Sequence, residues 1–268
     1  MAVSMYDVTL RGVALSSLAE EIIVRDIVEM QPTEDRQSAK RAMKPGTMVH
    51  SIVRRTLPVK IVFVIRAYNG VRRAEIMDSI AEWVGAGGKM TISTRPGKAL
   101  YVKPDRMPSL GSSLKWTEDI ELVLTAFSSP YWRDAEPTAV VLNTQLDAAD
   151  GLYRASDVIT APGNAETITM RMIIFASDPG NGYPKYIKVS AGDTMMELKG
   201  MQQGAAMIVV SYTNDDLLEI NVDDEPGLKY RTAESSDDLL LRCGEENTVS
   251  VESDAQVAVR CVFWGVWL

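Results

Sequence analysis

The sequence of 268 residues contains one histidine, His50, and only two cysteines, Cys243 and Cys261. A single imidazole excludes most catalytic triads, histidine-based metal sites and imidazole acid–base relays. Two thiols are too few for a thiolate zinc site, which takes about four ligands, or for the disulfide framework of a small secreted domain. We therefore expect a protein that is made in a reducing cytoplasm and kept there at least until assembly.

Long apolar runs and chemical signature motifs are also missing. No apolar stretch approaches the roughly twenty residues that a membrane-spanning helix needs. The first seven residues show no basic region followed by an apolar stretch, so we expect neither a targeting peptide nor a membrane partner. The sequence has no nucleophile elbow, phosphate loop or dinucleotide fingerprint. These absences predict no enzymatic activity, no catalytic residues, no cofactor and no metal site.

Charge is divided unevenly along the chain. Residues 1–137 hold 19 basic and 16 acidic side chains, a net charge of +3, whereas residues 138–268 hold 9 and 20, a net charge of −11. The overall charge of −8 and the pI near 4.9 argue against sequence-specific binding to nucleic acid, which rests on positive charge. The segment 130–137 contains two prolines and several charges, which predicts a linker between domains 1–137 and 138–268.

The first domain is predicted to combine strands with one helix. Short β-branched segments at 22–28, 59–65 and 120–127 predict strands. Apolar residues recur every three or four positions between residues 73 and 84, which predicts a helix with an apolar stripe. The apolar face of the strand 59–65 is predicted to hold Val59, Ile61, Phe63 and Ile65, and the stripe of the helix Ile76, Ile80, Trp83 and Val84.

Four positions after the helix, 85–88, include three glycines. Glycine adopts positive φ without steric cost, so the helix is predicted to stop there and to lead into an edge strand. Trp83, at the end of the helix, is expected to fill the core rather than to bind a ligand.

The polar stretch 31–46 is predicted as a long loop, and long loops in compact domains are usually functional or disordered. Basic residues gather in it and just after it: Arg36, Lys40, Arg41, Lys44, Arg54 and Arg55. Two interpretations stay open, a solvated surface loop or an arm that becomes ordered against a neighbouring subunit. Phosphate binding is disfavoured because no glycine-rich cradle or helix start lies nearby. On the second interpretation these six residues form a subunit interface.

The second domain is predicted to be an all-β sandwich. Strands are predicted at 168–174, 206–212, 217–222, 248–251 and 257–263, with turn residues and no helical pattern between them. Cys243 and Cys261 alternate with apolar neighbours, so both are expected to be buried as small hydrophobic residues rather than reactive thiols.

Two features of this domain suggest a ligand site, calcium for one and sugar for the other, but the spacing of their residues disfavours both. The acidic runs at 223–225 and 237–238 lack the alternating ligands and the glycine of a calcium loop, so they are predicted as solvated turns. Trp264 and Trp267 fall on opposite faces of a strand, which disfavours a shared sugar-stacking platform and favours core positions. Paired carboxylates for glycoside cleavage cannot be singled out among the acidic residues.

Two blocks of the first domain resemble the distal tail protein family of long-tailed, non-contractile phages and their prophages. Residues 83–96 read Trp-Val-Gly-Ala-Gly-Gly-Lys-Met-Thr-Ile-Ser-Thr-Arg-Pro, and residues 127–132 read Phe-Ser-Ser-Pro-Tyr-Trp. In that family a tryptophan-ended helix, a strand that begins with Gly-Gly, an Arg-Pro turn and a Phe-x-x-Pro-Tyr strand end occur in this order.

Weaker motifs continue the resemblance at 163–165, 192–196 and 239–249. The last motif departs from the family's Leu-x-x-Gly-x-Asn, because one extra residue separates Gly244 from Asn247. This departure affects the turn rather than the fold.

The resemblance implies a mainly β fold in two parts. The first is an α+β N-terminal domain, a curled sheet or split barrel with one helix, that forms a ring. The second is a galectin-like β-sandwich. The implied function is a structural component of a phage tail tip, or baseplate, that joins the tail tube to the host-adhesion apparatus, located in the virion after synthesis in the bacterial cytoplasm.

The partners implied by the resemblance are further copies of the chain, in a ring with six-fold precedent, the tail tube protein, a tail-tip or tail-associated protein, and a host surface glycan. A different class of function stays open, a stand-alone carbohydrate-binding, lectin-like surface module. A closed ring in solution would favour the first, and a monomer that binds glycans the second. An acid hydrolase is disfavoured.

Overall fold

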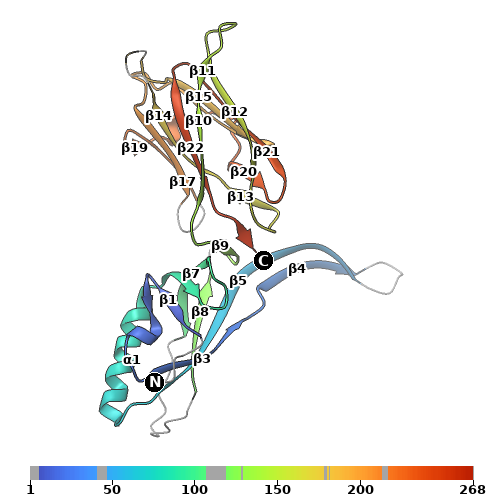
Figure 1. Ribbon diagram of the computed structural model, residues 1–268. Coiled ribbons are helices and arrows are strands. Elements are labelled where there is room, and N and C mark those ends of the chain that lie inside the picture. Colours follow the sequence, from blue (N-terminus) through green and yellow to red (C-terminus); the bar gives the residue numbers. More distant parts are fainter. Residues whose placement is uncertain are drawn as a thin grey trace. The chain divides into compact units, whose positions relative to one another are not determined.

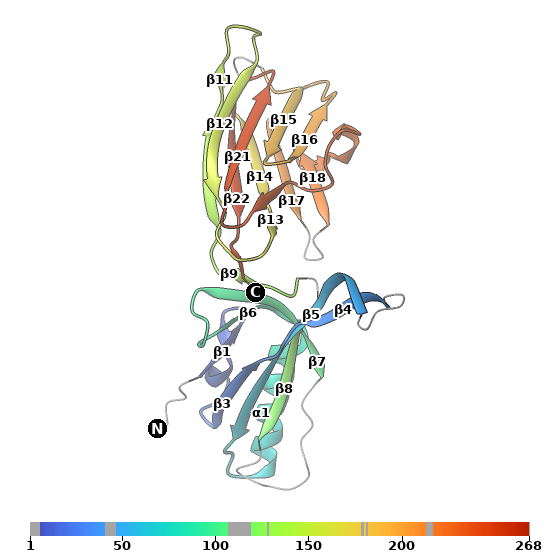
Figure 2. The same ribbon diagram turned by 90° about the vertical axis from the view of Figure 1, so that its right-hand side faces the viewer.

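The computed structural model describes residues 6–40, 47–106, 119–127, 129–177, 180, 182–212 and 217–267 (Figures 1 and 2). The chain forms two compact units, Met1–Ala135 and Glu136–Leu268. The fold is mainly β, with several antiparallel sheets and one long helix among the described residues, as the sequence predicts. In that part of the chain, no helix combines the length and the apolar character needed to cross a membrane.

The first unit is built on an antiparallel sheet with the open strand order β2-β1-β6-β7-β8-β5-β3. The strands of this unit and one 3-10 helix are β1 (Val8–Leu10), β2 (Val13–Ala14), η1 (Leu15–Ser17), β3 (Ile22–Glu29), β4 (Thr33–Lys40), β5 (Thr47–Ile65), β6 (Gly88–Ile92), β7 (Lys98–Arg106), β8 (Ile120–Ala126) and β9 (Trp132–Asp134). The strand after the glycine cluster, β6, pairs with both β1 and β7. The prediction that it is an edge strand is therefore wrong, because β1 returns from the start of the chain to cover it.

The predicted helix is present as α1 (Gly70–Gly85) and begins three residues earlier than expected. Its start is fixed by Asn69, whose side chain accepts a hydrogen bond from the backbone N–H of Arg72 at 2.7 Å. Its end is fixed at Gly87, where φ is +62° and a Cβ atom would lie 2.3 Å from the carbonyl oxygen of Val102. Only glycine fits there.

The core of the first unit lies between α1 and the sheet, as the sequence predicts (Figure 2). The predicted apolar face of β5 is buried, with Val59, Ile61 and Phe63 fully inaccessible. Trp83 is also buried, and its indole N–H donates to the carbonyl oxygen of Val13 at 3.0 Å. Trp83 is thus a core residue with a satisfied polar group, which confirms its predicted role.

Strand β9 lies inside the segment 130–137 that the sequence predicts as a linker. It pairs with β7, with Ala99 opposite Arg133. Trp132 anchors it, being 1 % exposed, with the Arg95 guanidinium 5.3 Å from its ring centroid. The linker prediction is therefore wrong for these residues, because burial of one large aromatic side chain outweighs the local proline and charge content.

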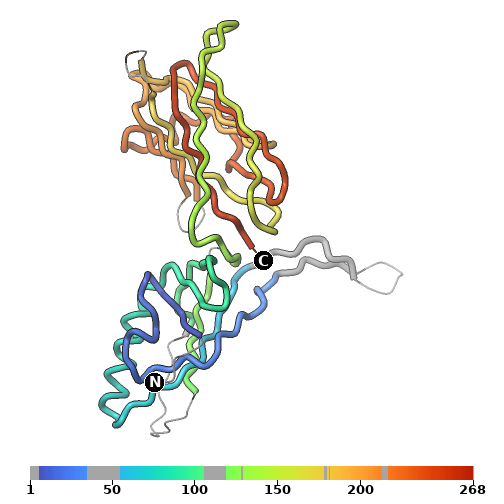
Figure 3. The backbone as a smooth tube through the Cα atoms, viewed as in Figure 1, coloured from blue at the N-terminus to red at the C-terminus, as the bar shows by residue number. Residues whose placement is uncertain are grey.

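The second unit is a β-sandwich, as predicted, and its backbone runs back and forth between two sheets (Figures 2 and 3). One sheet has the order β10-β22-β14-β17-β18-β19 and the other β11-β12-β21-β15-β16, while β13 pairs with β20. The elements are β10 (Thr138–Asn143), β11 (Gln145–Leu146), β12 (Tyr153–Thr160), β13 (Thr167–Thr169), β14 (Arg171–Ala176), β15 (Tyr186–Ala191), β16 (Thr194–Lys199), β17 (Met207–Tyr212), β18 (Leu218–Val222), β19 (Glu225–Pro226), η3 (Leu228–Tyr230), β20 (Leu240–Arg242), β21 (Glu246–Ser253), β22 (Val257–Phe263) and β23 (Val266–Trp267).

Alternation along these strands places apolar side chains between the two sheets. Ile174 and Val259 from the six-stranded sheet and Val189 and Val251 from the five-stranded sheet are each at most 2 % exposed. The predicted strand 168–174 is divided at Met170 into β13 and β14, which belong to different sheets. The other four predicted strands are confirmed as continuous elements.

The cysteines and the late tryptophans follow the predictions in part. Cys261 is fully buried, and burial raises the pKa of its thiol to about 12. Cys243 is only half-buried, although desolvation also raises its pKa. Trp264 and Trp267 are half-buried rather than core residues. The Arg171 guanidinium lies 4.8 Å from the centroid of the Trp264 ring, a cation–π contact at the surface.

Candidate functional site

Four of the six basic residues predicted to form a subunit interface lie on β4 and the first part of β5, in the first unit. Arg36 and Lys40 lie on β4, Arg54 and Arg55 lie on β5, and Arg41 and Lys44 lie outside the described residues. Arg55 is exposed. We call the paired segments 33–40 and 47–56 the arm (Figure 1).

The arm is an antiparallel ladder rather than a loop. Thr33 pairs with Thr56 and Lys40 with Thr47, with register shifts after Thr33 and after Gln37. The prediction of a loop is therefore wrong for residues 33–40. The sequence of β4 contains a single apolar residue, Ala39, so it lacks the alternation that reveals a half-buried strand. Its strand conformation comes from pairing with β5.

Within the described part of the chain, the arm is two-stranded. Residues 57–65 of β5 lie between β3 and β8, whereas residues 47–56 pair with β4 alone. At about 3.3 Å per residue, this part of β5 extends over about 30 Å. A two-stranded ribbon is marginally stable on its own, and its outer edges carry backbone N–H and C=O groups that another chain can pair with.

The second candidate region is the outer face of the five-stranded sheet of the sandwich. Strand register places Arg154 opposite Glu252 and Glu252 opposite Lys188, and in the next row Ser156 opposite Ser250. These residues and their neighbours line a surface groove of about 400 Å³. We call it the polar groove and define it by Arg154, Ser156, Lys188, Ser190, Ser250 and Glu252.

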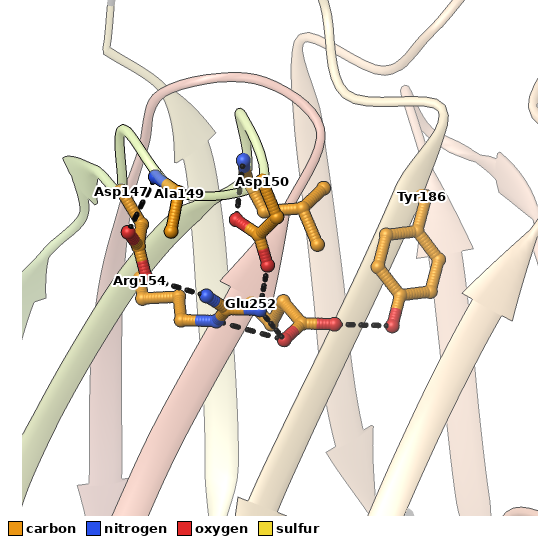
Figure 4. Close-up of polar contacts among 7 residues, drawn as sticks. Asp147, Ala149, Asp150, Arg154, Tyr186 and Glu252 are labelled. Carbon is orange, nitrogen blue, oxygen red and sulfur yellow. Dashed lines mark hydrogen bonds and ion pairs between the residues drawn. The ribbon is translucent and has the colours of Figure 1, made fainter.

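One arginine is held at the edge of the polar groove by three carboxylates (Figure 4). The guanidinium of Arg154 donates to Glu252 at 2.9 Å, to Asp147 at 2.6 Å and to Asp150 at 2.5 Å. The hydrogen bond that Arg154 donates to Asp150 is the main cause that raises the pKa of Arg154, and the same bond lowers the pKa of Asp150. Arg154 is therefore a fixed cation whose donors are largely used.

The network continues across the sheet through Glu252. Its second carboxylate oxygen accepts a hydrogen bond from the Tyr186 hydroxyl at 2.9 Å. Burial, followed by this hydrogen bond to a carboxylate, raises the pKa of Tyr186. The Lys199 ammonium lies 5.4 Å from the Tyr186 ring centroid and pairs with Glu197 at 2.8 Å. Charged side chains thus connect the strands from β12 to β16.

Glu197 ends this network as a buried carboxylate. It is 5 % exposed and accepts a hydrogen bond from the Thr232 hydroxyl at 3.0 Å. The hydrogen bond from Lys199 is the largest cause that lowers its pKa, outweighing desolvation. Glu197 is therefore an ionised structural group, whereas a catalytic general acid needs a raised pKa.

The acidic run at 223–225 forms a turn, as predicted. Asp223 and Asp224 both have positive φ, 47° and 67°, between β18 and β19, which is the geometry of a two-residue type I′ hairpin. The Asp223 carboxylate accepts the backbone N–H of Met207 at 2.8 Å. Over the described ranges, no three acidic, histidine or cysteine side chains are arranged to hold a metal ion.

Comparison with known proteins finds similar structures but no similar sequence. No family model and no curated protein sequence matches this chain. The chain is similar to the crystal structure of the Dit protein (gp 19.1) of phage SPP1, described as a paradigm of the hub adsorption apparatus in phages that infect Gram-positive bacteria. The TM-score is 0.71 at 9 % identity, over 99 % of this chain and 100 % of that chain.

The chain is also similar to a chain of the phage P2 baseplate in its activated conformation. The TM-score is 0.50 with calcium and with strontium, at 12 % and 11 % identity, over 96 % of this chain and 97 % of that chain. At such low identity these similarities show the fold. The mainly β architecture that the sequence predicts is thereby confirmed along nearly the whole chain.

Sequence reasoning identified the basic residues of the arm but missed the arm's strand and the whole polar groove. The groove residues occupy alternate positions, 154 and 156, 188 and 190, and 250 and 252, and each pair flanks one apolar residue, Ala155, Val189 or Val251. That alternation shows that they face outward. It does not show that the three pairs lie side by side, because strand order is a tertiary property.

Proposed function

We propose that this protein is a non-enzymatic structural component of a phage tail tip: a distal tail protein whose subunits form a ring between the tail tube and the host-adhesion apparatus. The observation that carries the proposal is the match to the SPP1 Dit structure, which spans both units from end to end. On this proposal the protein is located in the virion, after synthesis in the bacterial cytoplasm.

The arm gives the proposed ring a means of assembly. A ring forms when a head-to-tail interface repeats with a rotation that divides the circle, and the sequence resemblance gives six copies as the expected number. Such an interface buries roughly 800 Å² on each partner. Among the described residues no third strand pairs with the arm. The basic residues of the arm and of the segment 41–46 offer charge to an acidic neighbour: Arg36, Lys40, Arg41, Lys44, Arg54 and Arg55.

The charge distribution supports contacts between unlike surfaces. Residues 1–137 carry +3 and residues 138–268 carry −11. A ring subunit with this asymmetry attracts acidic surfaces of a neighbouring copy, of the tail tube protein or of a tail-tip protein through its basic half. Because exposed pairs contribute only about 0–1 kcal/mol each, many of them must act together.

A structural role also fits the chemistry of the charged groups. Arg154, Glu252 and Glu197 each hold at least two polar partners, so they connect neighbouring parts of the sandwich. The lowered pKa of Glu197 keeps it ionised. This supports a protein that acts through assembly and binding.

Sedimentation velocity over rising protein concentration, with negative-stain electron microscopy of the same samples, tests the proposal. We expect a discrete large species that grows with concentration and appears as closed rings. A monomer at every concentration, with no rings, would contradict the connector and leave the lectin-like surface module as the better description. Mixing with the tail tube protein of the same phage should shift the ring to a larger complex.

A further inference from the structure

The polar groove has a floor of small hydroxyl side chains. Ser156, Ser250 and Ser190 lie in one row across β12, β21 and β15, with each serine directly opposite the next. The adjacent row, one step along the strands, is Arg154, Glu252 and Lys188, so charged side chains border the serines on one side. A row of three small residues leaves room above the sheet, which gives the groove its volume of about 400 Å³.

Four polar side chains of the groove have hydrogen-bonding groups open to a ligand, although the Lys188 ammonium also interacts electrostatically with Glu197. The side chains of Ser156, Ser190, Ser250 and Lys188 make no hydrogen bond or ion pair with any other residue that the structure describes. Each hydroxyl both donates and accepts, and the ammonium has three donors. A ligand with several hydroxyl groups can therefore satisfy all four at once in exchange for water.

The border of the groove is already ordered without a ligand. Arg154 is fixed by Asp147, Asp150 and Glu252, and Glu252 is further fixed by Tyr186 (Figure 4). A ligand that contacts these side chains does not have to immobilise them, which removes part of the entropic cost of binding.

Charge around the groove favours a neutral ligand. In and around the groove there are four carboxylates and three cations. The carboxylates belong to Asp147, Asp150, Glu197 and Glu252, and the cations to Arg154, Lys188 and Lys199. The C-terminal half of the chain is itself strongly acidic. With Arg154 neutralised by its three carboxylate partners, the groove has no strong excess of positive charge to hold a phosphate or carboxylate ligand, and a neutral polyhydroxyl compound needs none. A volume of about 400 Å³ lies near the lower end of the range for small-molecule sites.

We propose that the polar groove binds a neutral saccharide, with Ser156, Ser190, Ser250 and Lys188 as direct contacts and Arg154 and Glu252 as a fixed border. This site adds a recognition function to the connector role and does not depend on ring formation. A tail-tip subunit with such a groove contacts surface glycans directly.

Saturation-transfer difference NMR on the full chain tests this proposal, because it works for a monomer and for a ring alike. The probes are lactose, maltose, cellobiose and N,N′-diacetylchitobiose, with glycerol 1-phosphate as the anionic comparison. We expect transfer to at least one disaccharide with millimolar affinity. The triple variant Ser156→Ala, Ser190→Ala, Ser250→Ala should bind about tenfold or more weakly, since it loses several hydrogen bonds.

Two further variants separate binding from folding. Ser250→Trp fills the groove from the floor and should abolish transfer, whereas Lys185→Ala, an exposed lysine at the start of the same β15 region but outside the groove, should bind as the unchanged protein does. Circular dichroism verifies that each variant is folded. The proposal is overturned by absence of transfer to all four disaccharides, by unchanged binding in the triple variant, or by tighter binding of glycerol 1-phosphate than of any disaccharide.

Discussion

The two halves of β5 form one continuous strand with opposite surroundings. Residues 57–65 lie between two neighbouring strands and alternate buried apolar side chains such as Val59 and Ile61 with more exposed ones. Residues 47–56 pair only with β4, whose sequence is almost entirely polar. Burial stabilises the first half by roughly 1.5–3 kcal/mol per large apolar side chain. Among the described residues the arm is a ladder of two strands with no third strand beside it, so we expect it to gain stability from another subunit.

The largest effect should come from the core half of β5. Phe63→Ala removes a fully buried ring and should lower the free energy of unfolding of the first unit by about 3–5 kcal/mol. Arg55→Ala, in the arm half and exposed, should change it by no more than about 0.5 kcal/mol. Urea denaturation followed by tryptophan fluorescence measures both. Equal losses from the two variants would show that the arm is part of the core fold.

Assembly should depend on the arm's charges as a group. Changing Arg36, Lys40, Arg41, Arg54 and Arg55 to glutamine should shift the ring equilibrium by a few kcal/mol toward monomers, with about 0–1 kcal/mol from each residue. The shift should shrink as salt is added, because salt screens exposed charges. Sedimentation across ionic strengths measures it.

A variant with Lys185, Lys229, Arg242 and Arg260 changed to glutamine is the control, since it removes almost as much positive charge from the second unit instead. If both variants assemble as the unchanged protein does at low salt, the basic residues of the arm are solvated surface.

Trypsin should cut the arm faster than the core half of β5. A two-stranded ribbon opens more often than a strand held on both sides. Trypsin should therefore cut after Arg36 or Lys40 of the monomer well before it cuts after Lys60, which lies in the core half. Assembly should slow the cuts in the arm and leave Lys60 unchanged. Mass spectrometry of timed digests gives the order, and equal rates in monomer and ring would mean that no partner covers the arm.

The smallest expected effect is the pH dependence of stability that Glu197 contributes in the β-sandwich. The pKa of Glu197 is lowered in the folded protein, so its ionised form stabilises the fold above the usual glutamate pKa of about 4.3. That contribution is lost as pH falls through the lowered folded-state value. As pH falls below 4.3, the Tm of the unchanged protein should therefore decrease more steeply than the Tm of Glu197→Gln. Parallel curves would show that Glu197 is not stabilised as an ion.

What the sequence predicts well is what is determined locally. The apolar stripe that ends at Trp83 and Val84 and the glycine required at position 87 establish the helix and its stop. The alternation of Val59, Ile61 and Phe63 establishes the buried half of β5. In each case the pattern and the burial have the same cause, so the prediction succeeds.

What the sequence does not predict depends on distant partners. Strand β4 has no alternation because its conformation comes from its ladder with β5. Strand β9 forms because Trp132 reaches the core despite two nearby prolines. The polar groove requires β12, β21 and β15 to be neighbours, although they are far apart in the sequence. Outward-facing serines carry no signal of that order.

The most direct test of the ring proposal is native mass spectrometry of the full chain beside an arm-shortened variant in which an Asn-Gly turn joins Asp35 to Val53, a pair already opposite in register. The shortened chain keeps the core half of β5. We expect closed hexamers from the unchanged protein and folded monomers from the variant. Hexamers from both would show that the arm does not build the ring, and monomers from both would contradict the ring itself.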